Sequence, residues 1–280
     1  NDIMDAAREL KPRFIALAGS PIPYMNGTDF PALAEVLEQE LGIPTFSVPT
    51  NGMHDYVYGA GLALEQIARQ FVPAKAVCEE KNIQPHTVNL LGVTPLDFGA
   101  YSRAGYMKKN LEKCGWKVLS TWAMGDDLEV LSHALEAEVN LVVSSVGLRT
   151  AKYLEKEFGT PYEVGYPFVD ELIPELDYAG KKLLIIHQQV IANAIRQEIR
   201  TRSDEQNTEV TVASWFMMKS ELSEEGDLSL KEEMDYCKLV QNGNYDIVFA
   251  DENMRGLVPG FKGTFVNVRH FAVSGKLQES

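Results

Sequence analysis

The stretch Phe14-Ile15-Ala16-Leu17-Ala18 decides the fold, together with the residues that follow it. An unbroken apolar run of this length is typical of a buried strand, and residues 19–27 supply a loop that contains Gly, Pro and Ser. Apolar residues then recur on one helical face, at Phe30, Leu33, Leu37 and Leu41. Gly42 ends this expected helix, and residues 43–48 begin a second strand. The pattern therefore predicts a strand–helix–strand unit.

The same arrangement recurs along the chain. Gly115 and Gly159 close two further helical patterns, and a short strand pattern follows each of them. Strands that lack polar alternation and are separated by helices indicate parallel sheets covered on both faces. We expect strands near residues 14–18 and 44–48, near 87–92, 117–120, 140–143 and 162–165, and near 182–186, 209–212, 246–249 and 264–266. The predicted fold class is α/β, with repeated doubly wound parallel sheets.

This pattern divides the chain into three domains, predicted at residues 1–82, 83–170 and 171–280. The first has only two clear strands, which is too few for a stable doubly wound sheet. We therefore expect the first domain to be incomplete and the chain to lack its natural beginning. Residues 221–233 are acidic with spaced leucines, and they are predicted to form a solvated loop and the start of a helix.

The composition narrows the function. The chain has 40 acidic and 26 basic side chains, a formal net charge of −14 and a pI near 4.9. Such a charge repels nucleic acid and anionic membranes, so neither is expected as a partner. The three cysteines, Cys78, Cys114 and Cys237, are far apart, which argues against a disulfide scaffold and favours a reducing compartment. No apolar run approaches the roughly 20 residues that span a bilayer, so a cytoplasmic protein is predicted.

Ligands of parallel sheets bind beyond the carboxyl ends of the strands, where four loops contain polar residues. They are residues 19–22, 92–97, 144–147 and 187–189. None matches GxGxxG or a Walker loop, so the sequence gives no support for a dinucleotide or ATP. Each loop by itself also fits ordinary helix capping. Their recurrence at equivalent ends of the three expected sheets makes them candidates for a binding site.

The five histidines form no pair at i, i+4 and no HExxH, which argues against a self-contained zinc site. His133 is expected on the surface of a helix, His86 in a structural position, and His54 in a turn-rich segment that opens a helix. His187 follows an all-aliphatic strand and is better placed for function. No GxSxG elbow supports Ser-His-Asp catalysis.

Seven segments in order resemble the nitrogenase component 1 type oxidoreductase family, which includes the nitrogenase molybdenum–iron protein, cofactor scaffolds and light-independent protochlorophyllide reductase subunits. They are residues 15–27, 42–44, 48–53, 88–92, 151–161, 180–182 and 270–275. The resemblance implies three Rossmann-like domains. It also implies a paired homologous subunit or a homodimer, and an ATP-dependent iron–sulfur reductase that supplies electrons.

Carried over residue by residue, the resemblance places a cluster-ligating cysteine of the family at Ser20. It places the cofactor cysteine near residues 143–145, where none occurs, and the cofactor histidine at His270. Because iron–sulfur clusters are held overwhelmingly by thiolates, nitrogen reduction by this chain is not expected. An iron–sulfur cluster would need cysteines that lie upstream or on a partner.

The combined expectation is a pocket that binds a preformed cofactor, a tetrapyrrole or an organic substrate, with electrons arriving from elsewhere, and no metal ligand is assigned. His187 and His270 are predicted as catalytic proton donors or cofactor ligands. The residues predicted to bind the cofactor are Ser20, Thr94, Ser144, Ser145 and Gly147. Three hypotheses follow: a nitrogenase-like oxidoreductase subunit, a scaffold or carrier of a metallocofactor precursor, and a small-molecule binding protein.

Overall fold

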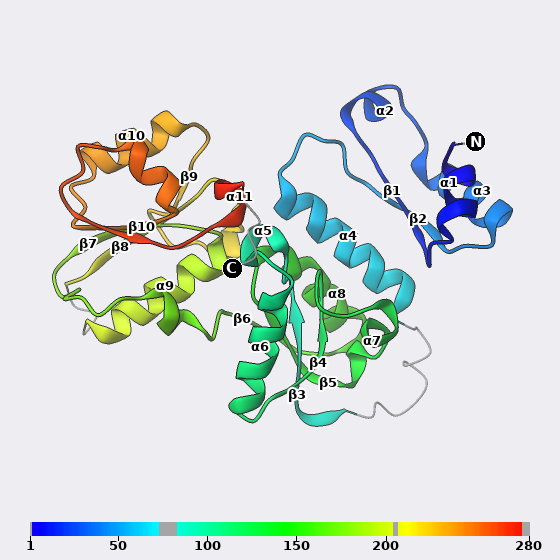
Figure 1. Ribbon diagram of the computed structural model, residues 1–280, viewed down its shortest axis with the longest axis horizontal. Coiled ribbons are helices and arrows are strands. Elements are labelled where there is room, and N and C mark those ends of the chain that lie inside the picture. Colours follow the sequence, from blue (N-terminus) through cyan, green and yellow to red (C-terminus); the bar gives the residue numbers. More distant parts are fainter. Residues whose placement is uncertain (1, 73–82, 204–206, 276–280) are drawn as a thin grey trace.

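A computed structural model describes residues 2–72, 83–203 and 207–275, and its strands form three separate parallel sheets (Figure 1). The first sheet pairs β1 (Ile15–Ala18) with β2 (Thr45–Val48). The second has the order β4-β3-β5-β6 and the third the order β11-β10-β7-β8-β9. Every strand pair is parallel. The prediction of an α/β fold with repeated parallel sheets is confirmed.

The second sheet contains β3 (Gln84–Leu91), β4 (Lys117–Thr121), β5 (Ala137–Val142) and β6 (Tyr162–Val164). The third contains β7 (Lys182–Ile186), β8 (Glu209–Ser214), β9 (Leu228–Ser229), β10 (Ile247–Ala250) and β11 (Thr264–Asn267). All expected strands are found within a few residues, because each is an apolar run that packs into a sheet. Only β9, two exposed residues long, was not expected.

The helices connect these strands. They are α1 (Asp2–Leu10), α2 (Pro21–Met25), α3 (Phe30–Leu41) and α4 (Tyr56–Phe71), then α5 (Pro95–Phe98), α6 (Ser102–Lys113), α7 (Leu128–Ser132) and α8 (Leu148–Phe158), and finally α9 (Gln189–Arg202), α10 (Glu233–Asn242) and α11 (Phe271–Ser274). Within the described residues, no helix is long and apolar enough to cross a membrane.

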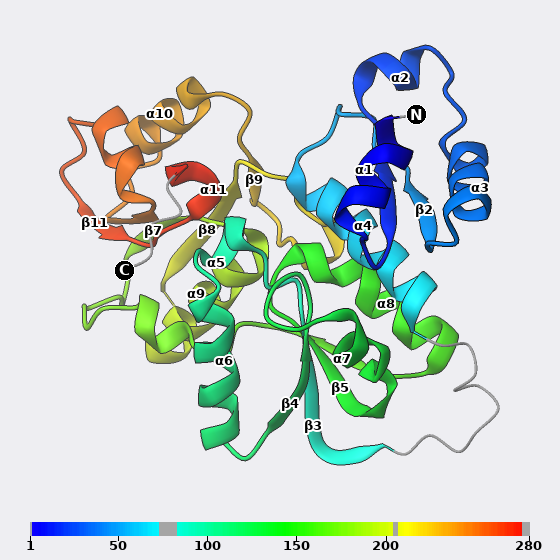
Figure 2. The ribbon, with the colours of Figure 1, turned by 45° about the vertical axis from the view of Figure 1, so that its right-hand side comes forward.

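Helix α4 joins the first part of the chain to the second sheet. Its apolar face, with Val57, Leu64 and Ala68, shares one buried core with Leu91 of β3 and Leu154 of α8. Figure 2 shows α4 and α8 side by side. Much of the stabilising apolar burial around residues 56–72 therefore lies against the second sheet. Where the domains divide stays a prediction.

One local expectation was wrong. Leu33 of α3 is 45% exposed, while Ala34 and Leu37 are buried, because the two-stranded sheet covers only a narrow face of this helix. The acidic segment of residues 221–233 is mostly exposed and leads into α10, as predicted, with one buried contact that the sequence did not indicate. It contains β9, and its Asp227 is buried in an ion pair with Arg196 of α9, whose Nη1 lies 2.6 Å from Oδ1.

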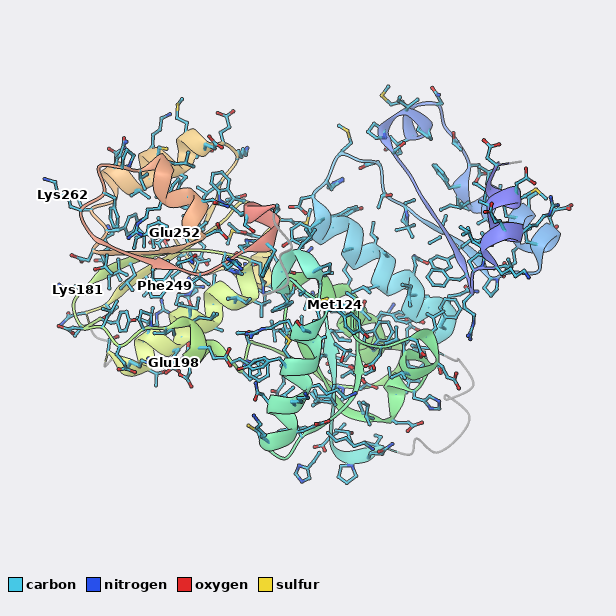
Figure 3. The ribbon with its side chains drawn as sticks, viewed as in Figure 1. Met124, Lys181, Glu198, Phe249, Glu252 and Lys262 are labelled. Atoms are coloured by element: carbon cyan, nitrogen blue, oxygen red, sulfur yellow. The ribbon has the colours of Figure 1, made fainter. Side chains whose placement is uncertain are left out.

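The third sheet shows the expected separation of apolar and charged side chains. Leu183, Leu184 and Ile185 of the central strand β7 are completely buried, as is Phe249 of β10. In Figure 3, Lys262 projects from the outer edge of this part of the molecule, whereas Phe249 lies among its elements. A rigid apolar sheet of this kind fixes the positions of the polar residues at its strand ends.

Candidate functional site

The strand ends of the second and third sheets meet where α5 and α11 lie side by side (Figures 1 and 2). This contact is close: a Cβ on Gly99, just after α5, would lie 2.3 Å from the Phe271 ring of α11. Gly99 also has a φ of +79°, which favours glycine. Both the lack of space for a Cβ and the positive φ therefore require glycine at position 99, and this glycine allows the two sheets to approach each other.

One buried carboxylate, that of Asp97 on α5, is the centre of this junction. Its Oδ1 accepts a hydrogen bond from the Tyr56 hydroxyl at 2.5 Å. Its Oδ2 accepts from the hydroxyls of Thr94 at 2.8 Å and Ser144 at 2.6 Å. Asp97, Thr94 and Ser144 are each less than 5% exposed. Three hydroxyl donors, brought from α4 and from the ends of β3 and β5, therefore surround one carboxylate.

These contacts determine which groups carry protons. Burial acts to raise the pKa of Asp97, but the hydrogen bond and charge of His270, with the hydroxyls of Ser144 and Tyr56, hold that pKa below its ordinary value. Burial, followed by the charge of Asp97, raises the pKa of the Tyr56 phenol. Near neutral pH Asp97 is therefore ionised and Tyr56 keeps its proton.

His270, which follows β11 and caps α11, faces this carboxylate from the third sheet. Its Nε2 lies 3.4 Å from Oδ1 of Asp97 and 3.3 Å from the Tyr56 hydroxyl. Because the Tyr56 hydroxyl donates its hydrogen bond to Asp97, the phenol oxygen can accept a hydrogen bond from Nε2–H. The backbone N–H of His270 donates to Asp251 after β10, at 2.9 Å. His270 is thus held at the backbone and directed at Asp97.

His187, which follows β7, stacks against His270 with ring centroids 4.4 Å apart. Its Nδ1 accepts the backbone N–H of Gln188 at 2.8 Å, and its Nε2–H donates to the carbonyl of Arg269 at 3.0 Å. Burial, reinforced by the charge of His270, lowers the pKa of His187 to about 3. His187 is therefore a neutral imidazole of one tautomer, and both of its nitrogens are engaged.

A cavity of about 480 Å³ lies against this cluster, and Asp97 and His187 form part of its wall. Apolar walls come from both sheets, from Phe98, Ile191, Val268 and Phe271. Two guanidinium groups also line it. Arg103 donates to Tyr166 and pairs with Glu171, and the Arg269 guanidinium lies 5.6 Å from the centre of the Phe271 ring. The cavity thus combines apolar walls with positive charge, which suits an organic anion.

The structure brings together four of the predicted site residues: His187, His270, Thr94 and Ser144. Ser145 lies beside them, but its buried hydroxyl has no hydrogen-bond partner within the described part of the chain. Gly147 has a packing role, because a Cβ there would lie 2.5 Å from the carbonyl oxygen of Leu91.

Ser20 is not part of this cluster. It is an exposed residue that precedes α2, and its side chain makes no capping hydrogen bond. Both views show α2 well separated from α5 and α11 (Figures 1 and 2).

The central residue, Asp97, was not among the predicted site residues. Thr94 and Asp97 have the spacing of a helix-capping pair, and the N–H of Asp97 does bond to the Thr94 hydroxyl at 3.2 Å. That spacing was the available signal, and it favours a local role. Tyr56 and Asp251 were missed for a related reason, since each begins or precedes a helix in an otherwise ordinary position.

The iron–sulfur cluster implied by the resemblance does not fit the residues of this junction. No group of three metal-ligating side chains occurs among residues 2–72, 83–203 and 207–275. Cys114 is exposed, and the Cys237 thiol contacts the carbonyl of Leu257. Cys78 lies outside the described residues. Carboxylate and hydroxyl oxygens with engaged imidazoles do not replace the thiolates that such clusters require.

Comparison with known proteins agrees with this architecture. A nitrogenase described as "Nitrogenase Cp1 at pH 5" superposes with a TM-score of 0.67 over 97% of this chain and 68% of that chain, at 16% identity, which shows the shared fold. The B-type subunit of light-independent protochlorophyllide reductase from Staurastrum punctulatum is 32% identical over 166 residues, 56% of this chain and 31% of that protein. Its counterpart of the same name from Pinus koraiensis is 27% identical over 161 residues, 57% of this chain and 32% of that protein.

The chain therefore spans about a third of the length of the curated relatives it matches. Residues 1–170, more than half of the chain, match the family described as nitrogenase component 1 type oxidoreductase. The resemblance predicted from the sequence is confirmed, and the chain belongs to the nitrogenase component 1 type oxidoreductase family.

Proposed function

We propose that the chain is part of a nitrogenase-like reductase subunit that binds an organic substrate in the cavity beside Asp97. Electrons would come from a partner iron–sulfur reductase, and a paired subunit would complete the complex. The observation that carries this proposal is the ionised, buried Asp97, which faces His270 on one side and lines a 480 Å³ cavity on the other. Relatives named protochlorophyllide reductase support a reducible organic substrate.

The proposed reaction adds two electrons and two protons to a double bond of the substrate. The reductase supplies the electrons and solvent supplies the protons. Asp97 contacts Nε2 of His270 and also forms part of the cavity wall, so a proton on Nε2 could pass to the cavity through the Asp97 carboxyl. The lowered pKa of Asp97 means that a proton placed on it leaves readily.

His187 serves this proposal as a positioning residue. A second imidazolium beside His270 would compete for the charge of Asp97, and the low pKa of His187 avoids this. The His187 ring stacks on the His270 ring, and its hydrogen bond to the Arg269 carbonyl fixes the backbone just before His270. Arg269 itself lines the cavity and is exposed, so its guanidinium is available to an anionic group of the substrate.

The test is turnover of the complete protein with its paired subunit, a cognate reductase and ATP under anaerobic conditions. Asp97→Asn keeps the size of the side chain and removes its charge, and we expect kcat to fall by a factor of about 100 or more. Arg255→Lys, at a surface ion pair far from the cavity, is the control and should leave kcat unchanged. Turnover of the Asp97→Asn variant at the unaltered rate would refute the proposal.

The same cavity also suits a carrier that releases its ligand unchanged, because its lining offers binding contacts whether or not a reaction follows. Electron consumption separates the two functions. Ligand binding without any oxidation of the reductase, in the assay above, would favour the carrier.

A further inference from the structure

A second cavity, of about 330 Å³, lies between α4, α8 and the segment that follows β8. Figure 2 shows this segment running from the third sheet towards α4 and α8. The cavity is lined by five cationic side chains, those of Arg69, Arg149, Lys152, Lys156 and Lys219. It has three carboxylates, those of Glu65, Glu157 and Glu221. These eight groups leave a net charge of +2, in a chain whose net charge is −14.

The carboxylates of this basic pocket are already engaged. Glu65 binds both guanidinium groups, with Oε1 2.7 Å from Arg69 and Oε2 2.9 Å from Arg149. Glu221 pairs with Lys152, and Glu157 pairs with Lys156 at 3.4 Å. The cationic groups therefore outnumber their partners.

Lys219 is the ammonium group without a carboxylate. Within the described residues it forms no ion pair, and its Nζ lies 3.4 Å from the sulfur of Met217. The side chain is half-buried. Its burial and the charge of Arg149 lower the pKa of Lys219. An anion in the pocket would relieve both effects, since it would compensate the desolvated charge and screen the two cations from each other.

We propose that this basic pocket binds a phosphate dianion, either inorganic phosphate or the phosphate group of a small monoester. The charge of +2 matches a group that carries close to −2 at neutral pH. Arginine supplies planar pairs of donors that match phosphate oxygens, and lysine supplies a mobile point charge. The pocket holds both kinds of donor on two packed helices and one adjoining segment.

The pocket is connected to the Asp97 cluster by that segment. Lys219 donates its backbone N–H to the Gln189 side chain at 2.7 Å. Phe216, three residues earlier, packs edge-on against His270 at 5.3 Å between ring centroids. Phosphate binding is therefore expected to order the residues that cover His270. The pocket itself does not depend on the proposed reduction.

The test is calorimetric titration of the intact chain with inorganic phosphate at low ionic strength. We expect saturable binding at one site, and Lys219→Met should weaken it at least tenfold because the variant keeps the length of the side chain without its charge. Lys262→Met, at the outer edge of the third sheet, is the control for general loss of positive charge and should bind as the unaltered chain does (Figure 3).

Competition distinguishes the two sources of phosphate. If glycerol phosphate displaces inorganic phosphate at a lower concentration, the site is for a monoester; the reverse order assigns it to the free ion. A thermal melt checks folding, since Lys219→Met should match the unaltered chain without phosphate but lose the rise in Tm that phosphate produces. Absence of saturable phosphate binding, or unchanged affinity in Lys219→Met, would overturn the proposal.

Discussion

Replacing Tyr56 by Phe removes a single oxygen atom and tests how much its hydrogen bond to the buried Asp97 carboxylate stabilises the folded chain. The hydroxyl lies 2.5 Å from Oδ1 of Asp97, and Oδ2 keeps its two donors from Thr94 and Ser144. After the substitution, Oδ1 retains only His270, at 3.4 Å. A buried carboxylate oxygen then loses its short hydrogen bond, with almost no exposed surface through which water could replace it.

A hydrogen bond to a charged group contributes about 1.5–3 kcal/mol, and an unsatisfied buried group adds the cost of its desolvation. We therefore expect Tyr56→Phe to lower the free energy of unfolding by about 2–3 kcal/mol. Urea denaturation at pH 7, followed by circular dichroism, measures this difference as a shift in midpoint at constant slope.

Tyr101→Phe is the matched control, because it removes a hydroxyl that bonds to the Gly125 carbonyl at 2.7 Å from a residue that is 66% exposed. Water replaces that bond, so the change in stability should stay within about 0.5 kcal/mol. The reasoning fails if the two variants are equally stable, since burial of the charged acceptor is the feature that separates them.

Three further outcomes are expected from denaturation experiments. The pKa of Asp97 is lowered in the folded chain, so its ionised carboxylate stabilises the fold at pH values above the ordinary aspartate pKa. This stabilisation is lost as the pH falls through the lowered, folded-state pKa. The free energy of unfolding of Asp97→Asn should therefore depend less on pH in this acidic range. Gly147→Ala should lower the free energy of unfolding by about 1–3 kcal/mol, because the added Cβ would clash with the carbonyl at the end of β3. Gly105→Ala, on the exposed side of α6, is the control and should raise the free energy of unfolding by about 0.5–1 kcal/mol. Arg196→Met should lower the free energy of unfolding by about 3–5 kcal/mol, because Asp227 would keep its two backbone N–H donors but lose the cation that pairs with its charge. Arg196→Met with Asp227→Asn removes the unpaired charge and keeps an acceptor for those donors, so it should recover much of that loss. A double variant as unstable as the single one would contradict this account.

The strands, and the sheet edges at which the loops after them lie, could be predicted because both depend on local information. The buried run of residues 182–186 is a strand in any parallel sheet, and the loop that follows it must lie at the carboxyl edge. The convergence of His187 with Thr94 and Ser144 depends instead on how two sheets pack against each other. Nothing in the local sequence pattern specifies that packing.

The misses have the same origin. Asp97 has a local partner three residues away and distant ones 41 and 47 residues away, and the local partner accounts for its presence in the sequence. Asp227 lies in an acidic segment whose composition indicates solvent, yet Arg196 of α9 draws it into a buried pair. The role of such a polar residue depends on the groups that tertiary packing places beside it. The local composition does not contain this information, and it predicts a position on the surface.

The two histidines illustrate how that packing divides roles between identical side chains. His187 has both ring nitrogens bonded to backbone groups, one of them on Arg269, so its ring fixes the distance between the ends of β7 and β11. His270 is held by its backbone N–H instead, which leaves Nε2 directed at Asp97. Since His187 is neutral, it does not compete with His270 for the charge of Asp97. The neutral His187 ring therefore positions its neighbours, whereas His270 contacts the carboxylate directly.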